Sequence, residues 1–160
     1  MAPIPSPVDS RVAAVSWNRG VIVDTTRPPD QAIVEELPLI RPGFYFYPAS
    51  WSLDGKLLYG SDLEEKSGEP TATYSYDFAT RTYKKLGPPD EQVFPLKDGR
   101  HLLYFYDEYL GVIDTADGSS RVVFDPSPDR VDSAGLSRDE KWLYLSIVSV
   151  DGDLWLAEPE

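Results

Sequence analysis

The stretch SLDGKLLY, residues 52–59, joins a tight-turn signal to a short apolar run. Its Asp-Gly pair is typical of a β-hairpin, because the Asp side chain bonds nearby backbone groups and Gly accepts a positive φ. The Leu and Tyr residues that follow favour a strand bounded by that turn. The stretch therefore predicts a hairpin whose second strand begins near Leu57.

The same pattern occurs twice more along the chain. Residues 96–105 read LKDGRHLLYF, and residues 137–145 read SRDEKWLYL, a copy that has lost its Gly. Asp54, Asp98 and Asp139, one in each copy, lie 44 and 41 residues apart. A period near 40 is typical of stacked structural units that bury their faces against one another. The sequence therefore predicts a repeat protein.

Each full unit contains four predicted strands. In the first full unit they lie near residues 44–49, 57–59, 73–77 and 82–86. Four-stranded antiparallel sheets that recur about every 40 residues are the blades of a β-propeller. The predicted fold class is all-β, with two complete blades flanked by two partial ones. The expected blades span residues 12–37, 44–86, 91–124 and 132–157.

The two ends of the predicted propeller are incomplete. Residues 1–11 are Pro-rich and are expected to be flexible, so no turn-bearing inner strand precedes the strand at 12–17. An open arc of blades leaves apolar faces bare. Three arrangements remain open. The chain is the C-terminal piece of a longer one, two copies complete one ring, or residues 12–16 pair outside residues 154–157 and close a small assembly.

Composition excludes several classes of protein. The 160 residues carry 27 acidic and 15 basic side chains, a net charge of −12, and acidic surfaces repel nucleic acid and anionic membranes. The 41% hydrophobic content is too high for a disordered chain, and 15 prolines are too many for a helical bundle. No signal peptide or membrane span of about 20 apolar residues is found. The expected location is cytoplasmic, or periplasmic within a longer exported protein.

Catalytic and cofactor motifs are not found in the sequence. His101 is the only histidine and there is no cysteine, so neither a multi-histidine metal site nor thiol chemistry is expected. No Gly-x-Ser-x-Gly elbow or phosphate-binding glycine loop is present. We therefore expect no catalytic residue, metal or cofactor, and a structural role for His101. Three tryptophans are expected to wedge between blades: Trp51, Trp142 and Trp155.

The sequence resembles TolB-type (WD-repeat-like) β-propellers of bacteria. The resemblance lies in the Asp-Gly turns followed by Leu-Leu-Tyr and in the closing runs WLYL at 142–145 and DLWL at 153–156. The resemblance covers about residues 44–158. It departs from the usual Ser-Pro-Asp pattern, because Leu53 and Arg138 replace the Pro and Leu96 replaces one Ser.

Propellers of this kind occur in the TolB translocation protein, in sensor-like domains of bacterial Ser/Thr kinases and in prolyl-oligopeptidase-type peptidases. The resemblance implies a non-catalytic segment that binds a protein or ligand, within a longer bacterial signalling or envelope protein. The alternative is an accessory propeller that gates a serine peptidase of the prolyl-oligopeptidase type.

Binding residues are expected on loops at the mouth of the propeller channel, because the sheets hold such loops in place. Segments that enter the inner strands lie nearest the axis. The expected partner is a protein or another propeller segment, including a second copy of this chain. The candidate ligand- or partner-binding residues are Arg41, Tyr45, Glu91, Arg130 and Asp132.

Overall fold

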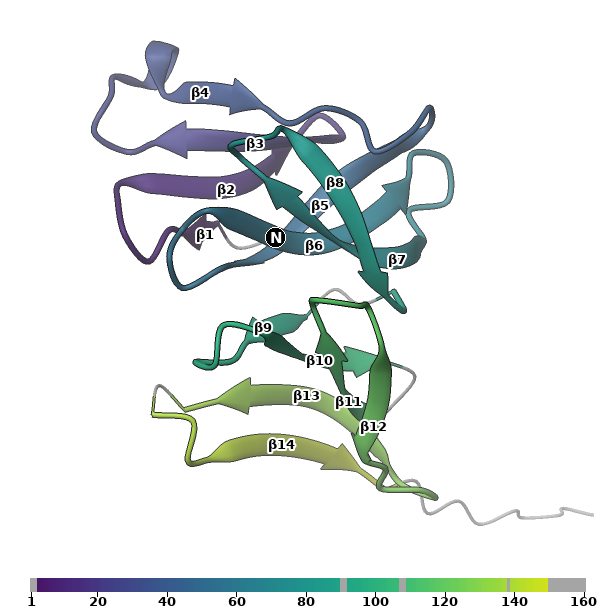
Figure 1. Ribbon diagram of the computed structural model, residues 1–160. Coiled ribbons are helices and arrows are strands. Elements are labelled where there is room, and N and C mark those ends of the chain that lie inside the picture. Colours follow the sequence, from purple (N-terminus) through teal and green to yellow (C-terminus); the bar gives the residue numbers. More distant parts are fainter. Residues whose placement is uncertain (1–2, 90–91, 107–108, 138, 150–160) are drawn as a thin grey trace, which may run out of the picture.

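The computed structural model describes residues 3–89, 92–106, 109–137 and 139–149, except for the side chain of Tyr106. It is all-β, with three four-stranded antiparallel sheets, one two-stranded sheet and a single 3₁₀ turn, η1 (Pro29–Gln31). The sheets follow one another in chain order and stack from the first at the top of Figure 1 to the fourth at the bottom. The predicted architecture of propeller blades is confirmed.

Each sheet is built from strands that are consecutive in the chain. The first sheet contains β1 (Ile4–Pro5), β2 (Arg11–Ser16), β3 (Arg19–Asp24) and β4 (Ile33–Glu36). The second contains β5 (Phe44–Trp51), β6 (Leu57–Glu64), β7 (Pro70–Asp77) and β8 (Thr82–Gly87). The third contains β9 (Val93–Pro95), β10 (His101–Tyr106), β11 (Tyr109–Asp114) and β12 (Ser120–Phe124). The fourth contains β13 (Arg130–Leu136) and β14 (Leu143–Val148).

The apolar core lies between sheets rather than inside any one of them. Side chains of successive strand residues alternate between the two faces of a sheet, so a covered blade is apolar on both faces. One cluster joins the first and second sheets, and includes Ala13, Ile22, Phe46, Leu58 and Tyr76. A second cluster joins the second and third sheets, and includes Tyr59, Leu86, Val93, Leu102 and Ile113.

The first sheet has one strand more than the sequence predicted. Ile4 and Pro5 pair with Ala13 and Val12, so the segment expected to be flexible supplies the inner strand β1. The Ser6 amide then donates to the Arg11 carbonyl at 2.8 Å. The same bond closes the three recognised turns, from Ser52 to Leu57, Leu96 to His101 and Ser137 to Trp142. Residues 6–11 are thus a fourth copy of the turn.

One of the three arrangements left open, pairing of residues 12–16 with residues 154–157, would need a free edge on β2. β2 already lies between β1 and β3, which pair with it on either side. The first and fourth sheets lie at opposite ends of the stack (Figure 1). Residues 154–157, the other half of the predicted pairing, lie outside the described residues, as does Trp155.

The tryptophans illustrate how burial depends on a neighbouring sheet. Trp51 is 4% exposed, and its Nε1 donates to the carbonyl of Ile4 in the first sheet at 2.9 Å, which confirms it as an inter-blade wedge. Trp142 is 66% exposed, so the prediction that it is buried is wrong. The reason is positional, because Trp142 directly precedes β14 of the last described sheet and no further sheet covers it in the described part of the chain.

Candidate functional site: a groove between the second and third sheets

A hollow of about 510 Å³ lies between the second and third sheets. Its walls are the β5–β6 turn, which includes Leu53, and the β9–β10 turn, which includes Leu96. A second hollow of about 310 Å³ shares Leu57, Tyr59 and Asp77 with it. The two hollows are therefore neighbours, and we call them together the inter-blade groove.

Tyr59 lies where the two hollows meet. It is 4% exposed and packs in the core that joins the second and third sheets. Burial, and secondarily the charge of Asp54, raise the pKa of the Tyr59 hydroxyl above its usual value. The phenol therefore stays protonated and can donate a hydrogen bond to a ligand.

The aspartates at the rim of the groove hold turns together. Asp54 Oδ1 accepts hydrogen bonds from Ser52 Oγ at 2.8 Å and from the Lys56 amide at 3.2 Å. These bonds, with the contribution of the Lys56 ammonium at 3.1 Å, lower the pKa of Asp54 to about 2. A carboxylate with a pKa this far below neutral is poorly suited to general acid–base chemistry at neutral pH.

The β9–β10 turn repeats this arrangement with His101 added. Asp98 Oδ1 accepts from the amides of Arg100 and His101 at 2.9 Å each. Asp98 Oδ2 lies 2.6 Å from His101 Nδ1. The hydrogen bonds from the His101 backbone and side chain lower the pKa of Asp98 to about 2. These contacts tie His101 into the turn.

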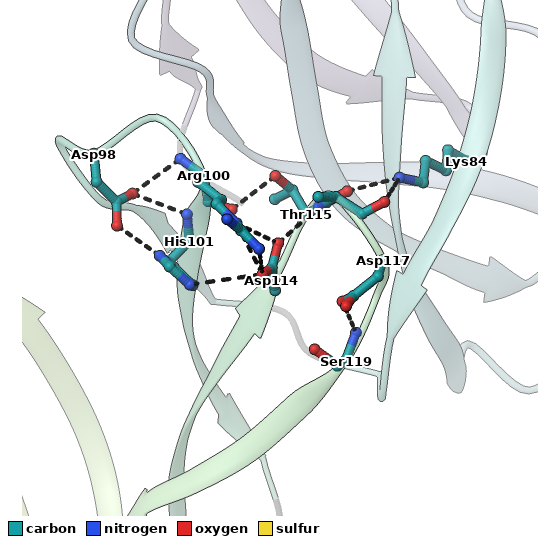
Figure 2. A network of polar contacts seen from close by, with 9 residues as sticks. Lys84, Asp98, Arg100, His101, Asp114, Thr115, Asp117 and Ser119 are labelled. Carbon is teal, nitrogen blue, oxygen red and sulfur yellow. Dashed lines mark hydrogen bonds and ion pairs between the residues drawn. The ribbon is translucent and has the colours of Figure 1, made fainter.

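A network of polar contacts joins the β9–β10 turn to the β11–β12 turn (Figure 2), and two of its members, Lys84 and Thr115, line the second hollow. Arg100 Nε donates to both carboxylate oxygens of Asp114, at 3.0 and 2.8 Å, and lowers the pKa of Asp114 to about 2. From the second sheet, Lys84 Nζ donates to the carbonyl oxygens of Thr115 at 2.7 Å and Ala116 at 2.8 Å. Lys84 therefore links the two sheets that form the groove.

Arg41 lies shortly before β5 and forms an isolated antiparallel bridge with Phe44, the first residue of that strand. Its Nη1 lies 2.9 Å from Oδ2 of Asp62, a carboxylate that is completely buried. Arg41 also donates to the hydroxyls of Thr71 at 3.0 Å and Tyr74 at 3.3 Å, and its guanidinium lies 3.6 Å from the centroid of the Phe44 ring. These contacts make Arg41 a structural residue of its blade.

The other sequence-predicted site residues are distributed over separate sheets. Tyr45 is half-buried in β5, Arg130 is the exposed first residue of β13, and Asp132 is exposed at an irregularity of the same strand. Glu91 lies outside the described residues. Tyr45, Arg130 and Asp132 do not line the inter-blade groove, and neither does Arg41.

Sequence reasoning placed Tyr59 in a strand without assigning it to a site. Tyr59 lies two residues after Leu57, so the two side chains are on the same face of the strand, and that face packs against the third sheet. The groove itself depends on how two turns from neighbouring blades are spaced, and this spacing cannot be read from either turn alone.

Comparisons with known proteins support the fold. No protein-family model and no curated protein matches the chain. Among solved structures, TolB from Acinetobacter baumannii superimposes with a TM-score of 0.61 at 20% identity, over 91% of this chain and 37% of that one. A protein assigned as TolB from Agrobacterium tumefaciens gives 0.66 at 18% identity, over 90% and 52%.

A propeller enzyme shares the fold to a similar degree. Oligogalacturonate lyase in complex with manganese gives a TM-score of 0.57 at 19% identity, over 89% of this chain and 43% of that one. The chain thus has the fold of TolB-type β-propellers and spans about a third to a half of the length of these relatives.

Within the described residues, no three His, Asp or Glu side chains gather closely enough to hold a metal ion. The described residues also contain no helix that is long and apolar enough to cross a membrane.

Proposed function

We propose that this chain is a non-catalytic propeller segment that binds an extended peptide segment of a partner protein in the inter-blade groove. The observation that carries the proposal is the pair of neighbouring hollows between two sheets, both of which are lined by the buried Tyr59. Binding sites of this kind combine mostly apolar walls with a few placed polar groups.

The acid–base groups near the groove favour binding over catalysis. Asp54, Asp98 and Asp114 are each held by turn hydrogen bonds that keep them ionised. His101 is engaged by Asp98 in the turn that borders the groove. Catalysis requires such groups to be positioned against a substrate with a pKa near the working pH.

The shape and chemistry of the groove suit a peptide. Leu53, Leu57 and Leu96 offer apolar contact area for a side chain, and the Tyr59 hydroxyl can donate to a main-chain carbonyl. Lys56 and Lys97 lie on the rim together with Asp54, so groups of either charge can be accommodated. An extended peptide presents side chains and main-chain carbonyls alternately along such a cleft.

The proposal is tested by selecting binders from a phage-displayed library of random peptides against the full chain. Selected peptides should lose about tenfold or more in affinity for Leu96→Asp, which places a charge on the apolar wall, and less for Tyr59→Phe, which removes one hydroxyl. Val122→Asp is the matched control, because Val122 is 51% exposed on β12 and does not line the groove.

Two results would overturn the proposal. Either no peptide is enriched above the background, or enriched peptides bind the Leu96→Asp chain as tightly as the unmodified one. Incubation of the chain with oligogalacturonate and Mn²⁺ tests the competing enzymatic role. We expect no cleavage product, and product formation would replace the binding proposal with a lyase.

A further inference from the structure

The outer edge of the third sheet is apolar and open. All four strands of this sheet are described, and its outermost strand, β12, pairs with β11 on one side and with no other described strand. Every residue of β12 is exposed, including Val122 at 51%, Val123 at 42% and Phe124 at 37%. An edge strand also presents main-chain amides and carbonyls that can pair with another strand. β12 therefore offers both apolar side chains and hydrogen-bonding groups to a further strand.

The outer strands of the first two sheets carry charges that β12 lacks. β4 ends in Glu35 and Glu36, and β8 has Lys84 and Lys85 at its centre. Charged side chains on an outer strand oppose edge-to-edge pairing. A register shift occurs where each of the three outer strands meets its neighbour, so a bulge does not distinguish them. After Arg121, by contrast, β12 has only apolar residues.

We propose that β12 pairs with β12 of a second copy of this chain, antiparallel across a two-fold axis near Val123. Arg121 and Asp125 flank the apolar run of β12 on either side, and both are exposed. In this arrangement Arg121 of each copy lies opposite Asp125 of the other, and the two Val123 residues meet near the axis. The two third sheets become one continuous sheet. This inference goes beyond the proposed function and does not involve the inter-blade groove.

A second copy is favoured over an unrelated strand because β12 is complementary to itself. Its positive end, apolar middle and negative end match the same sequence running in the opposite direction. Opposite charges across from each other stabilise an antiparallel pair, and like charges destabilise it. A two-fold contact uses the same surface on both copies and is therefore closed. Pro126 has no amide donor, which confines the pairing to β12 and Asp125.

Sedimentation equilibrium of the full chain tests the proposal, at concentrations up to about 500 µM because contacts of this size are weak. Salt at about 0.15 M screens the repulsion between two chains of net charge −12. We expect a particle of about twice 17.9 kDa. Val123→Asp places two like charges near the axis and should sediment at the single-chain mass. Val34→Asp is the matched control, because Val34 is 39% exposed on the outer strand β4, and it should remain paired. Circular dichroism confirms that each variant is folded.

Exchange of the two end charges tests the antiparallel arrangement. Arg121→Asp alone brings like charges together twice in the pair and should raise the dissociation constant about tenfold or more. The double variant Arg121→Asp and Asp125→Arg restores opposite charges at both places. Its dissociation constant should return to within about threefold of that of the unmodified chain.

Three results would overturn the proposal. They are a single-chain mass for the unmodified protein at all concentrations, retention of the pair by Val123→Asp, and a double variant that pairs no better than Arg121→Asp alone. The first result would leave the edge of β12 to a strand of another protein. Leu96→Asp should still pair, and Val123→Asp should still bind the peptides selected for the inter-blade groove. Failure of this proposal is therefore distinguishable from failure of the proposed function.

Discussion

Asp62 is a completely buried carboxylate whose oxygens are fully engaged. Oδ1 accepts hydrogen bonds from the amides of Thr71 at 2.9 Å and Ala72 at 2.8 Å, and Oδ2 lies 2.7 Å from Thr71 Oγ1 and 2.9 Å from Arg41 Nη1. A buried charge needs such compensation, because its transfer out of water is costly. Arg41 supplies the positive charge that balances it.

Replacement of Arg41 by Ala should destabilise the fold by about 2–3 kcal/mol. This is less than the full loss of a buried pair, because the Arg41 side chain is 40% exposed and three donors to Asp62 remain. Urea unfolding measures the change. Arg81→Ala is the control, since the Arg81–Glu35 pair at 3.2 Å involves a 65% exposed guanidinium and should cost under about 0.5 kcal/mol. Equal losses would contradict the structural role of Arg41.

The turn aspartates predict a specific dependence of stability on pH. Asp54, Asp98 and Asp114 have pKa values of about 2 in the folded chain, against an ordinary value of 3.8. A depressed folded pKa stabilises the fold above the unfolded pKa, and that contribution is lost as pH falls through the folded pKa. The free energy of unfolding should therefore decline between pH 3.8 and about 2.

Urea titrations at a series of pH values provide the measurement. The triple variant with Asn at the positions of Asp54, Asp98 and Asp114 is the control, because it should show a shallower decline in this interval. An unmodified chain whose stability stays level down to about pH 2 would contradict the assignment of these pKa values.

At the residue scale, the sequence indicated what role a side chain plays in a local turn better than which distant residues it contacts. The structural role of His101 follows from its place beside the Asp98 turn, and the structure shows that contact. Arg41 was selected for its nearness to the propeller axis, but its buried partner Asp62 lies 21 residues away and cannot be inferred from spacing. Tyr59 was not among the sequence candidates because the groove that it lines forms between two units.

At the element scale, the repeated turn was predicted in three units and missed in the first. Asp9 Oδ1 accepts from the Arg11 amide at 3.0 Å, as Asp54 Oδ1 does from the Lys56 amide at 3.2 Å. Asp9 stands one position later in its turn and is followed by Ser10 rather than Gly. The turn closes with the same backbone hydrogen bond despite this change, but a search of the sequence for Asp-Gly pairs does not find it.

Replacing Trp51 and replacing Trp142 should change the stability of the fold by very different amounts. Trp51→Ala should cost about 3–5 kcal/mol, because it empties a packed space between the first and second sheets. It also removes the Nε1 hydrogen bond to the Ile4 carbonyl at 2.9 Å, which anchors β1. Trp142→Ala should change stability by under about 0.5 kcal/mol in the single chain. Thermal or urea unfolding separates the two, and a large loss at Trp142 would contradict its exposure.

Gly111 is required by a close approach within the third sheet. A Cβ atom there would lie 2.3 Å from the ring of Tyr104, which covers the glycine from the neighbouring strand β10. Gly111→Ala should therefore destabilise the fold by about 1–3 kcal/mol, measured by urea unfolding. Gly135→Ala in β13 is the matched control, since nothing lies within 4 Å of its added Cβ. Equal effects would show that the Tyr104 ring can move aside without cost.

At the scale of the whole molecule, stability depends on neighbours. The second sheet is covered by the first and third, and Leu58 and Tyr76 are completely buried on it. The fourth sheet contributes only two described strands, with Trp142 and Tyr144 largely exposed. In stacked architectures each unit is stabilised by its own packing and by the interfaces that it shares. The end sheets should therefore open before the middle ones.

Native-state hydrogen exchange followed by mass spectrometry measures this gradient. Amides of β13 and β14 should exchange at least about 100-fold faster than those of β6 and β7, because local opening needs less free energy at an end. Uniform protection would mean that the four sheets open as one unit, and the stacking argument would then fail.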